Sequence, residues 1–431
     1  MIYHLFQALK DYDIPGQGLM NYLSFRAMMA SVTAVLFTLI AGKRIIRWLR
    51  HKQIGETVRD LGLEGQIQKK GTPTMGGIII LLGILTGALL FCDLTNVYVR
   101  LLLLSTVWCG ALGFADDYIK VFKHDKNGLS ERAKLVGQVA LGFIIGLTVW
   151  MSDDIVVREK VASNVSVTTE RTVDSEPLVT GGAWQEEDVV KSTKTTIPFV
   201  KKHEFDYKWL SPFKGAMGWY VKWAIYVLMI VVVITACSNG TNLTDGLDGL
   251  AAGTSAIVGL IIGILAWLGG NLIESNYLNI MYIPGSGEIA IFMSAFVGAL
   301  IGFLWYNSYP AQVFMGDTGS LAIGGVIGVA AVLIRKELLL PLLCGIFFVE
   351  SLSVLLQRFW FKATKKRNGG QGIRIWSMTP LHHHFQDKKE PEGRILIHKP
   401  VPPHHEAKIV ARFWIVGIIL AVATLALLKI R

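Results

Sequence analysis

Charged side chains are scarce in this sequence of 431 residues. Asp, Glu, Lys and Arg make up 17% of it, hydrophobic residues make up 52%, and mean hydropathy is +0.46. A soluble domain usually carries about a quarter charged residues, so the deficit argues against a water-soluble fold and favours a protein embedded in the lipid bilayer. The net charge of +10 could suggest nucleic acid, but the basic residues gather in particular loops, and we expect no nucleic-acid partner.

Cysteine is also rare, and its pattern excludes two classes of site. The cysteines lie within or beside apolar segments without CxxC spacing, which argues against a disulfide framework and against a zinc site. We also expect no cleavable signal peptide, because the first apolar run is long and has no small-residue cleavage site.

Long hydrophobic runs dominate the chain instead. A membrane-spanning helix needs roughly 20 mostly apolar residues, because the hydrocarbon core is about 30 Å thick. The sequence predicts ten such helices, at 22–48, 76–93, 97–115, 134–151, 218–237, 249–269, 288–305, 319–335, 337–361 and 410–430. We therefore expect an all-α polytopic membrane protein with about ten transmembrane helices.

The distribution of Lys and Arg predicts the orientation in the membrane. Basic residues accumulate at 43–70, 120–134 and 362–409, which ten spans place on one side. The loops 94–96 and 270–287 fall on the other side and nearly lack them. Because cytoplasmic loops are enriched in Lys and Arg, we expect the basic segments in the cytoplasm and both termini outside.

The chain is interpreted as one integral-membrane domain, 1–431. It carries an extracytoplasmic insertion at 152–217 and a large cytoplasmic loop at 362–409. The insertion mixes charges of both signs and is rich in Val and Thr, which predicts short strands or a hairpin. We expect it to be accessory, because nothing in it resembles a catalytic motif.

Polar clusters at helix ends are candidates for function, because charged groups beside a membrane are costly. Asp116 and Asp117 form an adjacent pair at the inner end of the third predicted helix. Their mutual repulsion suits a divalent cation or a base, and a water-exposed helix end is the alternative. Asn242, Asp245 and Asp248 recur every three residues. On a helix they would share one face, whereas the alternative is an Asx-rich turn that caps the next helix.

A third cluster precedes the eighth predicted helix. Asp317 could bind Mg²⁺ near the helix N-terminus, or it could simply cap that helix. Asn307 lies in the same cluster, and Phe314 is a candidate surface for stacking a nucleotide base.

Two further clusters suit phosphate groups. His382, His383 and His384 are consecutive and cannot all point one way, which argues against a three-histidine metal site and favours contact with a diphosphate; a solvated loop is the alternative. The segment 69–77 combines lysines, threonines and glycines, which suit a phosphate or nucleotide carbonyl, although lysines beside a membrane also serve as anchors. Under the predicted topology all five clusters face the cytoplasm, and we expect the active site there.

At these residues the sequence resembles the polyprenyl-phosphate N-acetylhexosamine-1-phosphate transferase superfamily, and within it the phospho-N-acetylmuramoyl-pentapeptide transferases. The strings that carry the resemblance are KKGTPTMGG at 69–77, FADDYIK at 114–120, GLSERAKLVGQ at 128–138, NLTDGLDGLA at 242–251, VFMGDTGSLA at 313–322 and PLHHHF at 380–385. They occur in the family's order and cover most of the chain. The departures are the long 152–217 segment, Gln386 where the family usually has Glu, and an insertion at 387–407.

The resemblance implies transfer of phospho-N-acetylmuramoyl-pentapeptide from its UDP derivative to undecaprenyl phosphate, giving lipid I and UMP. This is a step of peptidoglycan synthesis, and thus of cell-wall biogenesis, cell shape and cell division, in the bacterial cytoplasmic (inner) membrane. It also implies Mg²⁺ bound by Asp317, with Asp116 and Asp117 close by, one of them deprotonating or orienting the lipid phosphate. The substrate-binding residues that it implies are Lys69, Lys70, Thr74, Lys120, Asn242, Asp245, Asp248, Asn307, Phe314, His382, His383 and His384.

Several alternatives stay open at this stage. The mechanism is either a direct attack or a two-step route through a phospho-aspartate, and a homodimer is compatible with the resemblance. A sister enzyme that uses UDP-N-acetylglucosamine is the nearest rival, and PLHHHF argues against it. A transporter or lipid flippase is disfavoured, because such proteins place ionisable groups at the bilayer midplane in repeated, broken helices.

Overall fold

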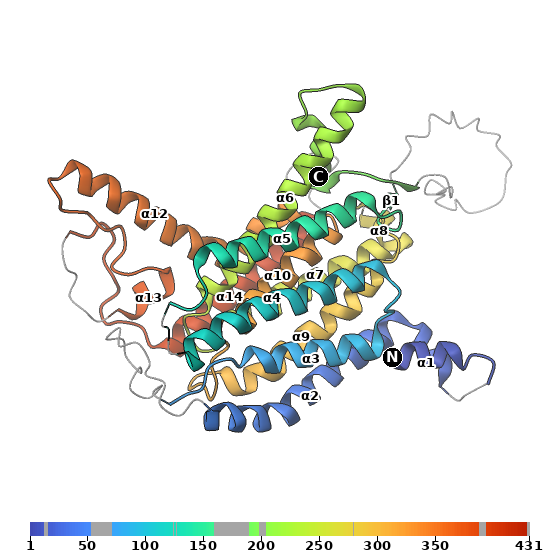
Figure 1. Cartoon of the computed structure of the whole chain (residues 1–431), viewed down its shortest axis with the longest axis horizontal. Coiled ribbons are helices and arrows are strands. Elements are labelled where there is room, and N and C mark those ends of the chain that lie inside the picture. The colour runs from blue at the N-terminus through green and yellow to red at the C-terminus, as the bar shows by residue number, and fades with distance from the viewer. Residues whose placement is uncertain are drawn as a thin grey trace, which may run out of the picture.

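The computed structural model describes residues 1–12, 16–52, 71–123, 125, 127–158, 189–197, 204–278, 280–387 and 394–428, and these are mostly helical (Figure 1). The long helices are α2 (Leu23–Lys52), α3 (Gly77–Phe91), α4 (Val97–Phe122), α5 (Glu131–Met151), α6 (Gly215–Thr244), α7 (Leu250–Gly270), α9 (Gly287–Asn307), α10 (Gly316–Leu333), α12 (Gly345–Arg367) and α14 (Glu406–Leu427). The short ones are α1 (Ile2–Ala8), α8 (Leu272–Leu278), α11 (Leu340–Leu343), α13 (Leu381–Gln386) and the 3₁₀ helices η1 (Gln17–Asn21), η3 (Tyr207–Leu210) and η4 (Glu337–Leu339).

Most of the predicted spans are present as helices long enough for a bilayer. Eight of the described helices are long and apolar enough to cross a membrane, and a bent pair formed by Glu337–Leu343 and α12 would make a ninth. The predicted span 76–93 forms α3, an apolar helix of 15 residues, which is shorter than the roughly 20 residues that a span ordinarily needs. The chain is therefore a helical polytopic membrane protein.

The predicted span 337–361 is not one continuous helix. The chain bends by 79° between Glu337–Leu343 and α12. Pro341 has no N–H and fits only the first turn of a helix, so the helix starts anew there as α11. Cys344 then leaves the helical conformation, with ψ of 27°, before α12 begins. As a result, α12 projects away from the rest of the bundle (Figure 1).

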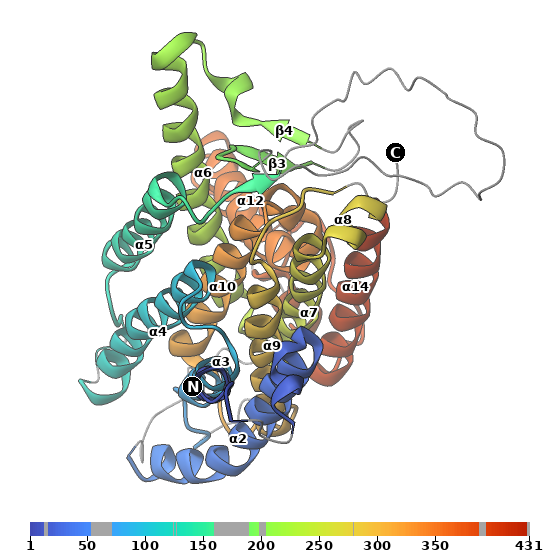
Figure 2. The same cartoon turned by 90° about the vertical axis from the view of Figure 1, so that its right-hand side faces the viewer.

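Helix α10 forms the centre of the bundle. In its most apolar stretch 89% of the residues are buried, compared with 22% in α2. Glycines allow its neighbours to approach closely, because a Cβ on Gly324 would lie 2.3 Å from the carbonyl oxygen of Cys237 in α6. Figure 2 shows α5 and α14 on opposite sides of this packed core.

The polar ends of the helices meet at one end of the bundle. The first residue of α14, Glu406, lies at this end, where its carboxylate accepts a hydrogen bond from the backbone N–H of Asp248 at 2.7 Å. Leu23, at the start of α2, instead packs at the start of α9, at the far end. Consequently, the first residue of α2 and the last residues of α14 both lie away from the polar clusters.

The predicted strands of the insertion are confirmed where the structure describes it. Strand β1 (Val157–Arg158) pairs with β2 (Val189–Val190), and β3 (Lys194–Thr196) pairs with β4 (Glu204–Asp206), both antiparallel. The β3–β4 hairpin is attached to the turn that follows α10, because the Thr196 N–H and the Thr195 hydroxyl both donate to the carbonyl oxygen of Arg335, at 3.0 and 3.1 Å.

Candidate active site

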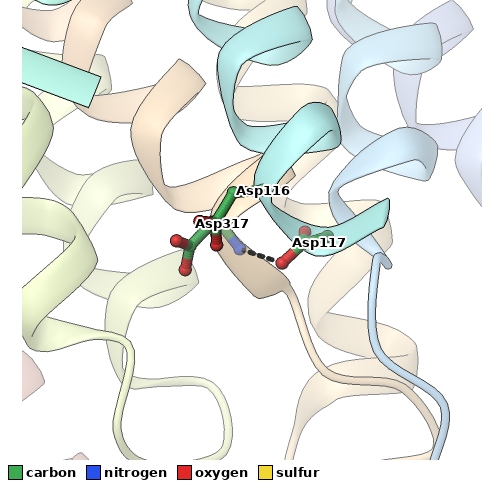
Figure 3. A group of neighbouring side chains, drawn as sticks. All are labelled: Asp116, Asp117 and Asp317. Carbon is green, nitrogen blue, oxygen red and sulfur yellow. Dashed lines mark hydrogen bonds between the residues drawn. The ribbon is translucent and has the colours of Figure 1, made fainter. Parts of the chain in front are cut away.

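Three carboxylates from two helices converge at the polar end of the bundle (Figure 3). Asp116 and Asp117 come from the last turns of α4, and Asp317 comes from the first turn of α10. Each offers a carboxylate oxygen, and these oxygens all lie within 4.8 Å of one another. Helix α4 extends to Phe122, beyond the predicted end at 115, so the Asp pair is held on a rigid helix rather than a loop.

The close approach of α4 and α10 depends on a missing side chain. A Cβ on Gly113 would lie 2.1 Å from the carbonyl oxygen of Asp317, so only glycine allows this contact. Asp117 then binds the start of α10. Its carboxylate accepts hydrogen bonds from the Asp317 N–H at 3.1 Å, and from the Thr318 N–H and hydroxyl at 2.8 and 2.6 Å.

Asp117 therefore satisfies N–H groups of the first turn of α10, which a helix leaves without partners of its own. The alternative in which Asp317 caps its own helix is wrong, since no side-chain cap occurs at the Met315 N-cap position. The carboxylate of Asp317 is left to face the other charged groups of the site.

Two lysines lie among the carboxylates. The Lys134 ammonium is 2.8 Å from an oxygen of Asp116 and 2.6 Å from one of Asp317. Lys120 contacts the same two residues and lies 3.2 Å from Asp317. Asn242 donates to the other oxygen of Asp317 at 2.9 Å. Three carboxylates face two ammonium groups, so the cluster carries one uncompensated negative charge when all three carboxylates are ionised.

The donor set of this cluster fits a divalent cation. Hard cations such as Mg²⁺ prefer carboxylate oxygens, and Asp116 and Asp317 offer them next to each other. Because one negative charge remains uncompensated, a cation would improve the local charge balance.

Asn242, Asp245 and Asp248 do not share one helical face, as they would if the stretch were a continuous helix. Helix α6 continues to Thr244 and ends there, so Asn242 points at Asp317 from within the helix. Asp245 is the C-cap, and Gly249 has a positive φ of 79°, which ends any helical continuation. Asp248 consequently turns away, and its carboxylate accepts from the Ala311 N–H at 3.0 Å.

The segment before α3 lies against the segment before α10. The N–H groups of Gly76 and Gly77 donate to the carbonyls of Phe314 and Met315, both at 2.8 Å. Thr74 is half-buried in this pairing, and Phe314 is half-buried beside it. Lys69 and Lys70 lie outside the described residues.

The side chain of Asn307 is hydrogen-bonded to the backbone of two loops. Its side-chain oxygen accepts from Gly249 at 3.0 Å and its amide donates to Val313 at 2.9 Å. It is buried, and both ends of its amide group are occupied by these loops. The side chain of Asn307 thus links the α6–α7 loop to the α9–α10 loop through these two hydrogen bonds.

The three histidines divide between two environments, as their consecutive positions on α13 require. His382 and His384 are buried, and His383 is half-buried. His384 Nδ1 lies 2.9 Å from the hydroxyl of Ser377, and burial lowers the pKa of His384 below its ordinary value of 6.5. His382 contacts the fully buried Glu350 of α12.

Three charged residues of this region were missed by sequence reasoning. Lys134 was interpreted only as part of a basic loop, although the Ser130 cap and one helical turn place it beside Asp116. Glu350 and Glu406 are single carboxylates in or beside apolar helices, and such rare intramembrane charges are themselves a signal of function.

Comparisons with known proteins identify the family of the chain. Residues 190–335 match Glycosyl transferase family 4, and residues 69–81 match the phospho-N-acetylmuramoyl-pentapeptide-transferase signature 1. The chain is 53% identical to a phospho-N-acetylmuramoyl-pentapeptide-transferase of Parabacteroides distasonis and 52% identical to one of Flavobacterium psychrophilum. A protein of the same name from Porphyromonas gingivalis is also 52% identical, and each of the three alignments covers 100% of both chains.

Proposed function

Because the chain belongs to the phospho-N-acetylmuramoyl-pentapeptide-transferase family, we propose that it transfers phospho-N-acetylmuramoyl-pentapeptide from its UDP derivative to undecaprenyl phosphate. The products are lipid I and UMP. The observation that carries this proposal is the convergence of three carboxylates and two lysines at one end of a membrane helix bundle.

Phosphoryl transfer requires neutralisation of phosphate charge and alignment of the attacking and leaving oxygens. In the proposed site, Lys120 and Lys134 attract phosphate oxygens, and Asp116 orients or deprotonates the phosphate of the lipid. Asp117 holds the first turn of α10, and thereby Asp317, at the correct place through its hydrogen bonds to Asp317 and Thr318.

Mg²⁺ is the proposed cofactor, held by Asp317 with Asp116 beside it. When bound, it would supply charge neutralisation for the transferred phosphoryl group. The carboxylate of Asp317 is oriented by the hydrogen bond that it accepts from the Asn242 amide.

The donor is proposed to lie between α6, α9 and α13. Asp245 and Asp248 would line the nucleoside and sugar site, with Phe314 as the stacking surface for uracil. Lys69, Lys70, Thr74 and His383 would contact phosphate or nucleotide. We assign Asn307, His382 and His384 to support of these groups, because all three are buried and contact neighbouring protein atoms.

The proposed location is the bacterial inner membrane, with the active site in the cytoplasm and both termini outside. Two features support this orientation. The basic last turn of α2, which holds Arg50 and Lys52, and the lysines Lys120 and Lys134 lie toward the polar end of the bundle, and cytoplasmic loops are enriched in such residues. The start of α2 and the end of α14 lie at the opposite end.

An exchange assay tests the proposal. Purified protein in detergent is supplied with undecaprenyl phosphate, Mg²⁺ and either UDP-N-acetylmuramoyl-pentapeptide or UDP-N-acetylglucosamine, and UMP release is followed. We expect metal-dependent release with the muramoyl donor alone. Release only with the glucosamine donor would contradict the proposed substrate and support the sister enzyme.

A matched variant tests the site. Asp317→Asn keeps the size of the side chain but removes its charge, and we expect turnover to fall by roughly a thousandfold in folded protein, the range seen when a group that stabilises transition-state charge is removed. Near-normal turnover in this variant would exclude Asp317 as the metal ligand.

A further inference from the structure

His382 is fully buried between α12 and the turn that joins α6 to α7. Its ring Nδ1 lies 3.3 Å from an oxygen of Glu350, and its backbone N–H donates to the same carboxylate at 3.2 Å. Glu350 is 0% exposed and lies on α12. A buried carboxylate without a partner is strongly unfavourable, so the backbone hydrogen bond to Glu350 fixes the start of α13 and places the imidazole beside the carboxylate.

The other edge of the imidazole ring contacts the α6–α7 turn. A Cβ on Gly246 would lie 2.1 Å from Nε2 and 2.8 Å from Cε1 of His382, so only glycine accommodates the ring. Both ring nitrogens of His382 are buried, and neither has a hydrogen-bond partner among the described residues. This edge of the His382 ring therefore packs against the turn at Gly246 without a hydrogen bond.

Gly246 belongs to the turn that carries the two acidic residues assigned to the donor. It follows Asp245, the C-cap of α6, and precedes Asp248, and its N–H donates to the carbonyl of Thr244 at 2.9 Å. Asn242, one turn earlier on α6, is bonded to Asp317. A displacement of this turn would move donor-binding groups without removing any of them.

We propose that Glu350, His382 and Gly246 form a strut that positions the Asp245–Asp248 turn for the nucleotide donor. In this arrangement His382 is a positioning residue, and it does not contact the substrate itself. Glu350 contacts one edge of the imidazole. The opposite edge supports the turn at Gly246, which has no side chain. This inference rests on the proposed function, because Asp245 and Asp248 are assigned there to the donor.

The strut predicts a selective effect on donor affinity. Glu350→Gln removes the negative charge beside the imidazole ring. Gly246→Ala adds a Cβ that collides with the opposite edge of the same ring. Both should raise the KM for the UDP donor about tenfold, the order of effect of losing one hydrogen bond to a charged group. The kcat and the KM for undecaprenyl phosphate should change by less than about threefold, since no group that contacts the reacting phosphate is altered.

A double variant separates the strut from general damage. In the His382→Ala background the ring that would collide with the new Cβ is absent. Gly246→Ala should therefore add nothing to the raised KM of His382→Ala, although it is harmful alone. Glu350→Asp keeps the charge on a shorter side chain, and its KM should lie between those of wild type and Glu350→Gln.

Glu288→Gln is the matched control. Glu288 is likewise a buried carboxylate, paired with Arg26 at 2.6 Å, but it lies at the start of α9, at the far end of the bundle. Its replacement should lower thermal stability and leave the KM for the donor unchanged.

Affinity for UDP, measured by titration calorimetry of the folded variants in detergent, gives a readout that does not depend on turnover. It should weaken about tenfold in Glu350→Gln and Gly246→Ala. If His382→Asn abolishes UDP binding while those two variants bind normally, His382 contacts the ligand and the strut is wrong. Failure of the proposed function is distinguishable, because it would appear as an absence of UMP release by the wild-type protein with the muramoyl donor.

Discussion

Replacement of Lys134 by Met should strengthen the binding of Mg²⁺ while it impairs turnover. The Lys134 ammonium lies 2.8 Å from Asp116 and 2.6 Å from Asp317, so it competes with a cation for the same oxygens. Mg²⁺ lies about 2.1 Å from its ligand oxygens, which would place it about 4 Å from this ammonium. Two unit charges at that distance interact by about 1 kcal/mol in a water-like medium, so a divalent ion is repelled by about 2 kcal/mol.

That energy corresponds to about a thirtyfold gain in Mg²⁺ affinity when the lysine is removed. This value is the lower end of the repulsion, because the side chain of Lys134 is only 19% exposed and the effective dielectric constant near a protein surface lies below that of water. Turnover should nevertheless fall at least tenfold at saturating Mg²⁺, because a positive charge that neutralises the transferred phosphate is lost.

The assay is titration of Mg²⁺ into metal-free protein in detergent, followed by UMP release at saturating metal. Lys123→Met is the control, since Lys123 follows the same helix α4 but is exposed at its C-cap. It should leave both quantities unchanged. Weaker Mg²⁺ binding in Lys134→Met would refute the reasoning, because the lysine would then support the cation rather than compete with it.

Three further predictions concern the fold around the site. Gly113→Ala should lower the free energy of unfolding by about 2 kcal/mol and reduce turnover, because the new Cβ meets backbone of α10 at 2.1 Å. Gly110→Ala, one turn earlier, meets only the end of the Leu81 side chain and should be nearly neutral in a thermal unfolding assay. Deletion of 160–187 should spare UMP release, because the described strands and their bonds to Arg335 remain; inactivity of a folded deletion variant would contradict an accessory role. Burial lowers the pKa of His384 below 6.5, so the folded protein binds fewer protons than the unfolded chain just below that pH. Its contribution to stability should be complete above pH 6.5 and decline as pH falls, and His384→Asn should flatten this part of the pH profile of thermal stability.

Hydropathy predicted the helical architecture well, because a span of apolar residues has few alternatives in a membrane. It failed at 337–361, where the total hydropathy is high but Pro341 interrupts the helix. It also placed the ends of α4 and α6 several residues too early. Polar residues lower hydropathy, yet Asp116 and Asn242 remain helical because their partners lie on neighbouring helices.

The three carboxylates of the candidate site were predicted from the sequence, whereas other charged residues of the region were missed. Asp116, Asp117 and Asp317 could be found because acidic residues beside apolar helices are rare. The different contacts of the three could not be predicted, since nothing in the sequence indicates that Asp117 binds N–H groups of a helix 200 residues later. Lys134 and Glu350 were missed for the same reason: their roles depend on contacts between helices that only the fold brings together.

The hairpin bonded to Arg335 has a consequence for how the protein is assembled during synthesis. Arg335 has a positive φ of 56°, a conformation that an unsupported arginine rarely adopts, and its carbonyl is held by Thr195 and Thr196. Because the chain emerges from its N-terminus, these threonines are made well before the turn that needs them. We expect the hairpin to act as a template that is already present when α10 arrives, so the end of α10 is fixed before α12 is completed.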